Sequence, residues 1–157
     1  MTTEIMHFNI RVYVIIINEK NEILLSDEYQ MDMRMTKFPG GGLIPGEGIT
    51  DCIKREAMEE FGQEIEIIRH YYTTDFFQKS MFFKDTQLIS IYYLARFTRK
   101  PQFAISEKPY DFEDINGSQS FRWFPLQQIC ADIMSFPIDK KVADMLNGDC
   151  GRGLCVG

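Results

Sequence analysis

The N-terminal part of the chain carries two apolar runs that are typical of β-strands. Residues 10–18 are rich in valine and isoleucine, which favours a buried strand. Residues 18–21 have the polar composition of a tight turn, and an apolar pattern returns over residues 22–28. We therefore predict a β-hairpin from these two runs. Residues 29–37 show no clear period and are predicted to form a loop.

The rest of the chain alternates apolar segments with polar segments that contain proline and glycine. Pro137 could start the last helix and Gly148 could end it. Strands dominate, and a well-signalled helix lies between them, so the pattern predicts one α/β domain with helices packed on a mixed sheet. We expect the tail from about residue 148 to 157 to be disordered. The other predicted elements are strands over 65–76, 86–97 and 121–124, a loop over most of 98–119, and short helices near 126–134 and 138–147.

The early helix is predicted between Thr50, a good N-cap, and Gly62, a C-terminal stop. Its residues can be placed on a helical wheel at about 100° per residue. The apolar stripe consists of Ile49, Cys52 and Ile53, and the opposite side carries Asp51, Lys54 and Arg55.

Three glutamates of this helix do not join its polar side. Glu56 and Glu60 prolong the apolar stripe, and Glu59 lies at its edge. Carboxylates that point toward a sheet need protons, basic partners or a cation. Three such groups within about one turn suit a hard divalent metal such as Mg²⁺ or Mn²⁺. The alternative is that they are solvated surface acids.

Composition narrows the function classes further. The net charge of −6 and the pI near 4.9 argue against a nonspecific nucleic-acid binder. A phosphate-bearing small molecule remains compatible with an acidic chain, because a bound metal reverses the local charge. No apolar run reaches the length of a membrane span, so we expect a cytoplasmic protein without a membrane partner. The four cysteines have no zinc-binding spacing and are expected to be free thiols, with a bridge or metal site at Cys150 and Cys155 in the tail as the alternative.

A glycine-rich loop precedes the early helix and includes Gly41 and Gly42. Such loops can cradle phosphate with backbone N–H groups, but no G-K-[ST] follows, so this is not a P-loop. The alternative is a tight turn that lets the helix start close to a strand.

The loop and the helix together resemble the Nudix box. Positions 41–63 read GGLIPGEGITDCIKREAMEEFGQ and reproduce the spacing G-x5-E-x7-R-E-U-x-E-E-x-G-U at each glycine and charged position. Two apolar positions depart from the pattern, since Ala57 replaces a larger aliphatic residue and Gln63 replaces an aliphatic one. The preceding KFPGG and the later FRWFPL are also similar to segments of this family.

The resemblance implies an α/β/α sandwich around a mixed sheet, and hydrolysis of a nucleoside diphosphate linked to another moiety by attack of water on phosphorus. Mg²⁺ or Mn²⁺ would be the cofactor, and metals would neutralise phosphate oxygens and activate water. The implied roles are metal ligation by Glu56, Glu59 and Glu60, assistance by Glu47, an ion pair from Arg55 that joins helix and loop, and loop conformation at Gly41 and Gly42.

Outside the box, further residues are candidates for the site. Glu113 and Asp114, in the loop before the late strand, are candidates for a general base or ordinary loop acids. Arg34 and Lys37 could meet phosphates or face solvent. Phenylalanines, among them Phe76, Phe77, Phe82 and Phe83, could stack on a base or pack in the core.

The substrate within the class is not specified by the sequence. Members that cleave ADP-ribose typically carry a proline sixteen residues after the box, where this chain has Lys79. A binding module that senses a nucleotide without cleaving it is the main alternative, but such modules often lose box glutamates that this chain keeps. An isomerase on the same scaffold is a more distant one. The partner is expected to be a nucleotide-derived small molecule, and a homodimer stays open.

Overall fold

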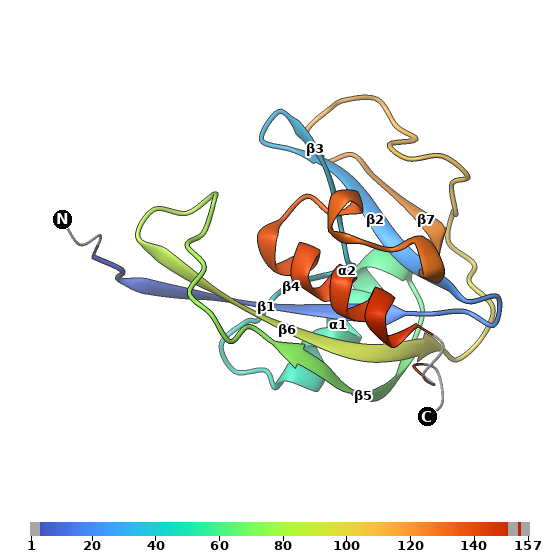
Figure 1. The fold of residues 1–157 in the computed structure, drawn as a ribbon, viewed down its shortest axis with the longest axis horizontal. Helices are drawn as coiled ribbons and strands as arrows, with labels where there is room; N and C mark the ends of the chain where they lie inside the picture. The colour runs from blue at the N-terminus through green and yellow to red at the C-terminus, as the bar shows by residue number, and fades with distance from the viewer. Residues whose placement is uncertain (1–3, 151–153, 155–157) are drawn as a thin grey trace.

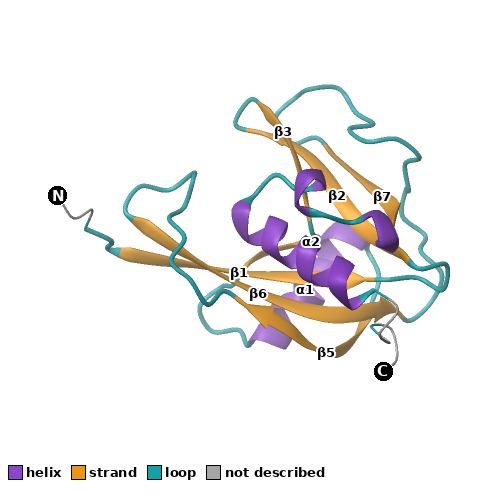
Figure 2. Cartoon of the chain, in the orientation of Figure 1, coloured by secondary structure: helices purple, strands orange, loops and turns teal. Residues whose placement is uncertain are grey.

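The computed structural model describes residues 4–150 and residue 154. Within them the chain forms two β-sheets and two α-helices (Figures 1 and 2). The elements are β1 (His7–Ile16), β2 (Glu22–Gln30), β3 (Met33–Lys37), β4 (Gly40–Gly42), α1 (Ile49–Phe61), β5 (Ile65–Thr73), β6 (Thr86–Phe97), β7 (Gln119–Pro125) and α2 (Pro137–Asp149), with 3-10 turns at Leu126–Gln128 and Ala131–Ile133.

The larger sheet is mixed, as the pattern predicts. Its order is β4-β1-β6-β5, with β1 parallel to β6 and the other pairs antiparallel. The smaller sheet is antiparallel and has the order β3-β2-β7. A parallel pair needs a long crossover. Here the crossover is the segment between β1 and β6, which contains β2, β3, β4, α1 and β5.

The two helices lie on opposite faces of the larger sheet, with α2 in front of it and α1 behind it in the view of Figure 1. Successive side chains of a strand point to opposite faces, so β1 contributes to two separate cores. Alternate residues Val12, Val14 and Ile16 pack with α1, and Tyr13, Ile15 and Ile17 pack with α2. This is the predicted α/β/α arrangement.

The predicted hairpin between the first two strands is wrong. The turn forms, with Asn18 N–H bonded to the Glu22 carbonyl, but a single bridge between Ile17 and Ile23 is all that pairs the strands in the described chain. Both are interior strands that pair along both edges, β1 with β4 and β6 and β2 with β3 and β7. They obtain those neighbours in different sheets.

The predicted loop over 29–37 is also wrong, because β2 runs to Gln30 and β3 begins at Met33. Met31 and Asp32 form the turn with φ of 52° and 58°. Such a turn usually contains glycine or asparagine. Because Met31 and Asp32 are neither, the sequence pattern did not indicate the turn. The loop over most of 98–119 is confirmed.

The C-terminal end of α1 matches the prediction, and its N-terminal end does not. Gly62 ends the helix with φ of 66° and donates its N–H to the Met58 carbonyl. At the other end the N-cap is Gly48 and not Thr50, and Asp51 accepts the Gly48 N–H at 3.0 Å. The unusual box residue Gln63 is buried and holds the next loop, since its Oε1 accepts the Gln102 N–H at 2.9 Å.

The C-terminal part differs in detail. The helix predicted near 126–134 is two 3-10 turns, because Ile129 between them is extended while its side chain is buried. α2 starts at Pro137 as predicted and continues through Gly148 to Asp149. Most of the tail expected to be disordered, residues 151–153 and 155–157 with Cys155, lies outside the described residues.

The described cysteines, Cys52, Cys130 and Cys150, are free thiols. Among the helices that the structure describes, none has the length and apolarity to cross a membrane.

Candidate metal and substrate site

Arg55 joins the loop before α1 to the acids of the helix. Its Nη2 and Nε lie 2.7 and 3.0 Å from the two carboxylate oxygens of Glu47, and Nη2 also donates to the Gly42 carbonyl at 3.0 Å. Nη1 donates to Glu56 at 3.0 Å and to Glu59 at 3.2 Å. The wheel assigned Arg55 to the polar side, but its side chain is partly buried between the loop and the acids of the helix.

Glu47 is the acid that Arg55 holds most closely. Hydrogen bonds from Arg55 and from the Ile44 N–H lower the pKa of Glu47 to about 2. Because Glu47 stays ionised through the physiological pH range, the loop remains attached to α1. The ion pair therefore fixes the position of the neighbouring acids before any ligand binds.

The three box glutamates differ in exposure. Glu59 is the most exposed, at 58% of its side chain, whereas Glu56 is only 16% exposed. The pKa of Glu60 is raised to about 7, mainly by burial and also by the neighbouring charges of Glu28 and Glu56, while Lys37 opposes the shift. This inward position of Glu60 matches the wheel. A bound cation would relieve its burial and the repulsion around it.

Gly41 provides the space that the Glu56 carboxylate occupies. A Cβ added to Gly41 would lie 2.2 Å from Glu56 Oε1 and 2.4 Å from its Cδ. Any other residue at this position would therefore displace the carboxylate. Gly42 differs, because its nearest atom to an added Cβ is Arg11 Nη1 at 3.5 Å, an ordinary contact.

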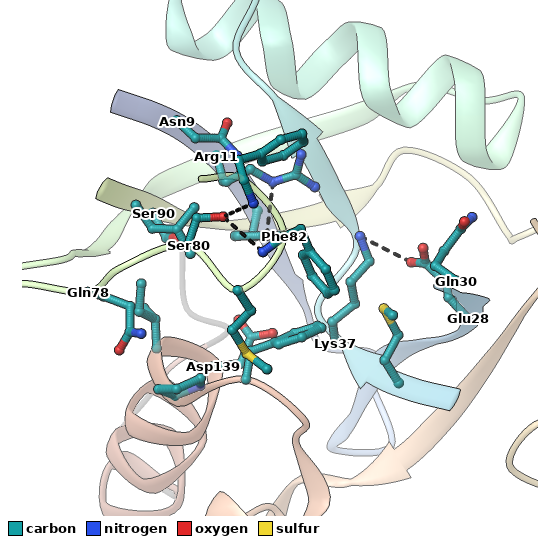
Figure 3. Close-up of a pocket in the computed structure, with 18 of the residues that line it drawn as sticks. Asn9, Arg11, Glu28, Gln30, Lys37, Gln78, Ser80, Phe82, Ser90 and Asp139 are labelled. Carbon is teal, nitrogen blue, oxygen red and sulfur yellow. Dashed lines mark hydrogen bonds and ion pairs between the residues drawn. The ribbon is translucent and has the colours of Figure 1, made fainter. Parts of the chain in front are cut away.

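A cavity of about 380 Å³ lies between the two sheets and the start of α2 (Figure 3). The box glutamates do not line it, but the charge of Glu56 acts on Arg11 and that of Glu60 acts on Lys37, two residues of its wall. Arg11 and Lys37 are its basic residues, and Glu28 lies opposite Lys37 with 3.1 Å between Nζ and Oε2. Although burial opposes it, Tyr13 and Glu28 raise the pKa of Lys37, so it remains an ammonium ion.

The far part of the cavity has aromatic walls and a buried acid. Phe82 and Phe136 are in edge contact, with ring centroids 5.7 Å apart. Asp139, in the first turn of α2, accepts a hydrogen bond from the Tyr92 hydroxyl at 2.5 Å. Burial raises the pKa of Asp139 to about 6. The cavity therefore offers flat apolar surfaces and a polar group at one end, with cations at the end near α1.

The structure brings only some of the predicted substrate residues to this cavity. Lys37 lines it, but Arg34 is exposed and pairs with Asp114 at 2.9 Å. Phe76 lies under the Lys141 ammonium and Phe77 is exposed, and neither lines the cavity. Of the four phenylalanines considered, Phe82 and Phe83 line it.

The two candidates for the base lie elsewhere. Asp114 is tied to Arg34, and Glu113 is an exposed residue of the long loop before β7. No contact within the described chain joins either acid to the box glutamates.

Three charged residues of the site were not predicted: Arg11, Glu28 and Asp139. Arg11 carried a signal, because it interrupts an otherwise apolar strand. Glu28 lies at the end of a predicted strand, where polar residues are common, so its type gave no signal. Asp139 sits where an acid simply favours the helix dipole, so only the fold reveals that it borders a cavity.

The residues present fit a hard divalent cation. Carboxylate oxygens are the ligands that Mg²⁺ and Mn²⁺ prefer, and Gly41 leaves room for the Glu56 carboxylate. Within the part of the chain that the structure describes, no three acidic, histidine or cysteine side chains already converge on one point. Arg55 engages one oxygen of Glu56 and one of Glu59, and among the described residues the other oxygen of each has no hydrogen-bond partner and is free to accept a metal.

The half-buried position of Glu60 predicts a pH-dependent stability of the metal-free protein. Its folded pKa of about 7 lies above the unfolded value near 4.5, so the native state binds more protons between these pH values. The free energy of unfolding should therefore fall as pH rises through this range, by an amount on the order of 1 to 3 kcal/mol. Thermal melts in EDTA at several pH values measure this, with Glu60→Gln as the comparison.

The Gln variant should lose much of that decline, because it resembles the protonated acid at every pH. Asp139, whose pKa burial also raises, contributes equally to both proteins and cancels from the difference. Parallel stability curves for the two proteins would contradict the raised pKa of Glu60.

Solved structures of similar fold share this architecture at low sequence identity. A NUDIX hydrolase from Nitrosomonas europaea is 18% identical, with 89% of each chain covered and a TM-score of 0.64. A MutT protein from Methanosarcina mazei Go1 is 17% identical, with 96% of this chain and 99% of that chain covered and a TM-score of 0.65. An ADP-ribose pyrophosphatase from Streptococcus suis 89-1591 is 19% identical, with 92% of each chain covered and a TM-score of 0.57. At these identities the likeness shows the fold alone.

A comparison with curated proteins gives no match. The family comparison is decisive, because the model described as NUDIX domain matches residues 7–146, which include both sheets, α1 and most of α2. The chain belongs to the Nudix hydrolase family.

Proposed function

We propose that the protein is a Mg²⁺- or Mn²⁺-dependent pyrophosphohydrolase that cleaves a nucleoside diphosphate linked to another moiety. The observation that carries the proposal is the set of box glutamates together with a cavity whose two cations, Arg11 and Lys37, lie within reach of the charges of Glu56 and Glu60. Divalent metal at these glutamates would neutralise phosphate charge and lower the pKa of the attacking water. This chain's own residues then have to bind, orient and enclose the substrate.

The cations Arg11 and Lys37 are suited to the phosphates. Both line the cavity, and Lys37 is held by Glu28 while Arg11 donates from Nε to the Tyr13 hydroxyl at 3.2 Å. Because their positions are fixed before binding, little entropy is lost when they meet phosphate oxygens. They would align the diphosphate between the cavity and α1.

The aromatic part of the cavity is suited to a nucleobase. Phe82 and Phe136 supply apolar ring surfaces against which a base can stack. Asp139 accepts hydrogen bonds and would favour a base edge that carries N–H groups. The remaining moiety of the substrate stays undefined. The proposal implies a cytoplasmic protein whose partner is a small nucleotide derivative.

A panel of nucleoside diphosphate derivatives and nucleoside triphosphates, each with Mg²⁺ or Mn²⁺, tests the proposal. Released mononucleotide, pyrophosphate and phosphate are quantified by chromatography, with EDTA-treated reactions in parallel. We expect at least one member to be hydrolysed only with metal. Binding to several members without turnover of any would contradict the hydrolase and support the non-catalytic module.

A further inference from the structure

Glu28 belongs to the strand face that packs on α1, although it lies outside the box. On β2, Leu24 packs in the core with Ile53 and Ala57 of α1. Alternation places Ser26 and Glu28 on the same face further along the strand. Gln119, which donates to Glu28 Oε2, is also a hydrogen-bonding neighbour of Glu60 near the end of α1, so the two carboxylates lie close together. Glu28 is 14% exposed and lines the cavity.

The hydrogen bonds of Glu28 end on one oxygen. Its Oε2 accepts from Ser26 Oγ at 2.9 Å, from Lys37 Nζ at 3.1 Å and from Gln119 Nε2 at 3.4 Å. Among the described residues, no hydrogen bond or ion pair ends on Oε1. The carboxylate is thus anchored through Oε2, while Oε1 keeps its full capacity to accept.

Glu28 also shares the electrostatic environment of the box acids. Its charge acts on Glu60 in the same direction as that of Glu56, and it acts on Arg11 together with Glu56. A carboxylate near two others, with one unoccupied oxygen, is suited to a cation that the others also bind. Lys37 on Oε2 then serves as the partner that orients a metal ligand.

We propose that Glu28 is a fourth carboxylate of the metal centre, with Oε1 facing the cation and Oε2 held by Lys37, Ser26 and Gln119. The proposal rests on the proposed function, since it takes the box glutamates as metal ligands. It assigns β2 a direct part in metal binding, in addition to α1. Mere retention of Lys37 is the competing role for Glu28, and it predicts wild-type metal binding once Lys37 is removed together with Glu28.

The test is a titration of the protein with Mn²⁺ in the absence of substrate, in which electron paramagnetic resonance measures the free Mn²⁺. Glu28→Gln should weaken Mn²⁺ binding by at least about 10-fold, the lower end of the cost of losing even an outer partner of a metal site. The control is Glu66→Gln, because Glu66 is also a strand glutamate with a basic partner, Arg96 at 3.0 Å, but lies on β5 and is exposed. This control should bind like the wild type.

The double variant Glu28→Gln/Lys37→Met separates ligation from charge. It removes one negative and one positive group, so the net charge of the site is unchanged and no unpaired cation stays buried. We expect it also to bind Mn²⁺ more weakly than the wild type. Water-proton relaxation by the bound ion should rise in both Glu28 variants, because a water replaces the lost carboxylate.

Wild-type affinity in Glu28→Gln or in the double variant, or weaker affinity with unchanged water relaxation, overturns the assignment of Glu28. A wild-type protein that binds no Mn²⁺ contradicts the proposed function itself. Loss of Mn²⁺ binding in Glu56→Gln and Glu60→Gln with normal binding in Glu28→Gln contradicts only this inference.

Discussion

Glu60→Gln is expected to lose nearly all turnover while the protein stays folded. Burial already favours the protonated form of Glu60 in the metal-free protein, and glutamine has the same shape as that form. The fold therefore tolerates the change, but a hard cation loses an anionic ligand. Loss of an outer partner of a metal site typically costs about 10- to 100-fold in activity. We expect kcat to fall by more than this, because Glu60 would contact the metal directly.

Glu59→Gln should have a similar effect on turnover, although Glu59 is the most exposed of the three acids. Rate assays and circular dichroism are the measurements. Glu64→Gln is the matched control, since Glu64 is an exposed glutamate just beyond the same helix. Full activity in both Glu59→Gln and Glu60→Gln would mean that these acids are surface groups without a part in the reaction.

Gly41→Ala is expected to reduce turnover by about 100-fold. The new Cβ would lie 2.2 Å from Glu56 Oε1, so the carboxylate must move by roughly 1 Å, and a displacement of that size in a catalytic site can cost about 100-fold. The clash involves the end of a flexible side chain and not backbone, so the fold should survive. Rates and thermal melts with and without Mg²⁺ measure both consequences.

Gly42→Ala provides the control, because its Cβ meets only Arg11 Nη1 at 3.5 Å. It adds the same methyl group to the adjacent residue of β4. We expect activity close to that of the wild type. Equal losses in the two variants would indicate a general effect on the loop and would contradict a specific role of Gly41 as the seat of the Glu56 carboxylate.

Much of the fold could be predicted because its central elements carry strong local signals. The valine- and isoleucine-rich run of β1 and the long apolar run of β6 each give a clear strand pattern. The pairing of strands could not be predicted in the same way. β1 and β2 are joined by a real turn yet belong to different sheets, and only the tertiary arrangement decides which neighbour each buried strand finds.

The site shows the same division between local and tertiary information. The spacing of the box indicated Glu56, Glu59 and Glu60 as candidate metal ligands. The helical wheel placed Glu60 toward the interior, in agreement with its half-buried position. Arg11 and Asp139 come from strands and helices far apart in sequence and meet only at the cavity. Their types and spacings have no shared pattern, so a single sequence cannot associate them.

The loop acids illustrate the opposite case. Glu113 and Asp114 precede β7 closely and looked suitably placed for a general base. In the fold, the long loop carries them over the outer part of the smaller sheet, where Asp114 pairs with Arg34. Glu28, in a strand, lies in the cavity beside Lys37 instead. Position along the chain was therefore a poor guide to position in the site.

The most direct test of the account is hydrolysis of the identified substrate in ¹⁸O-labelled water with Mg²⁺, with mass spectrometry of the products. Attack of water on phosphorus at a metal centre predicts that the label enters a phosphate group of one product, and that chelation of the metal prevents its incorporation. Label in the alcohol product, which indicates cleavage of a carbon–oxygen bond, or incorporation that persists after thorough chelation, would contradict it.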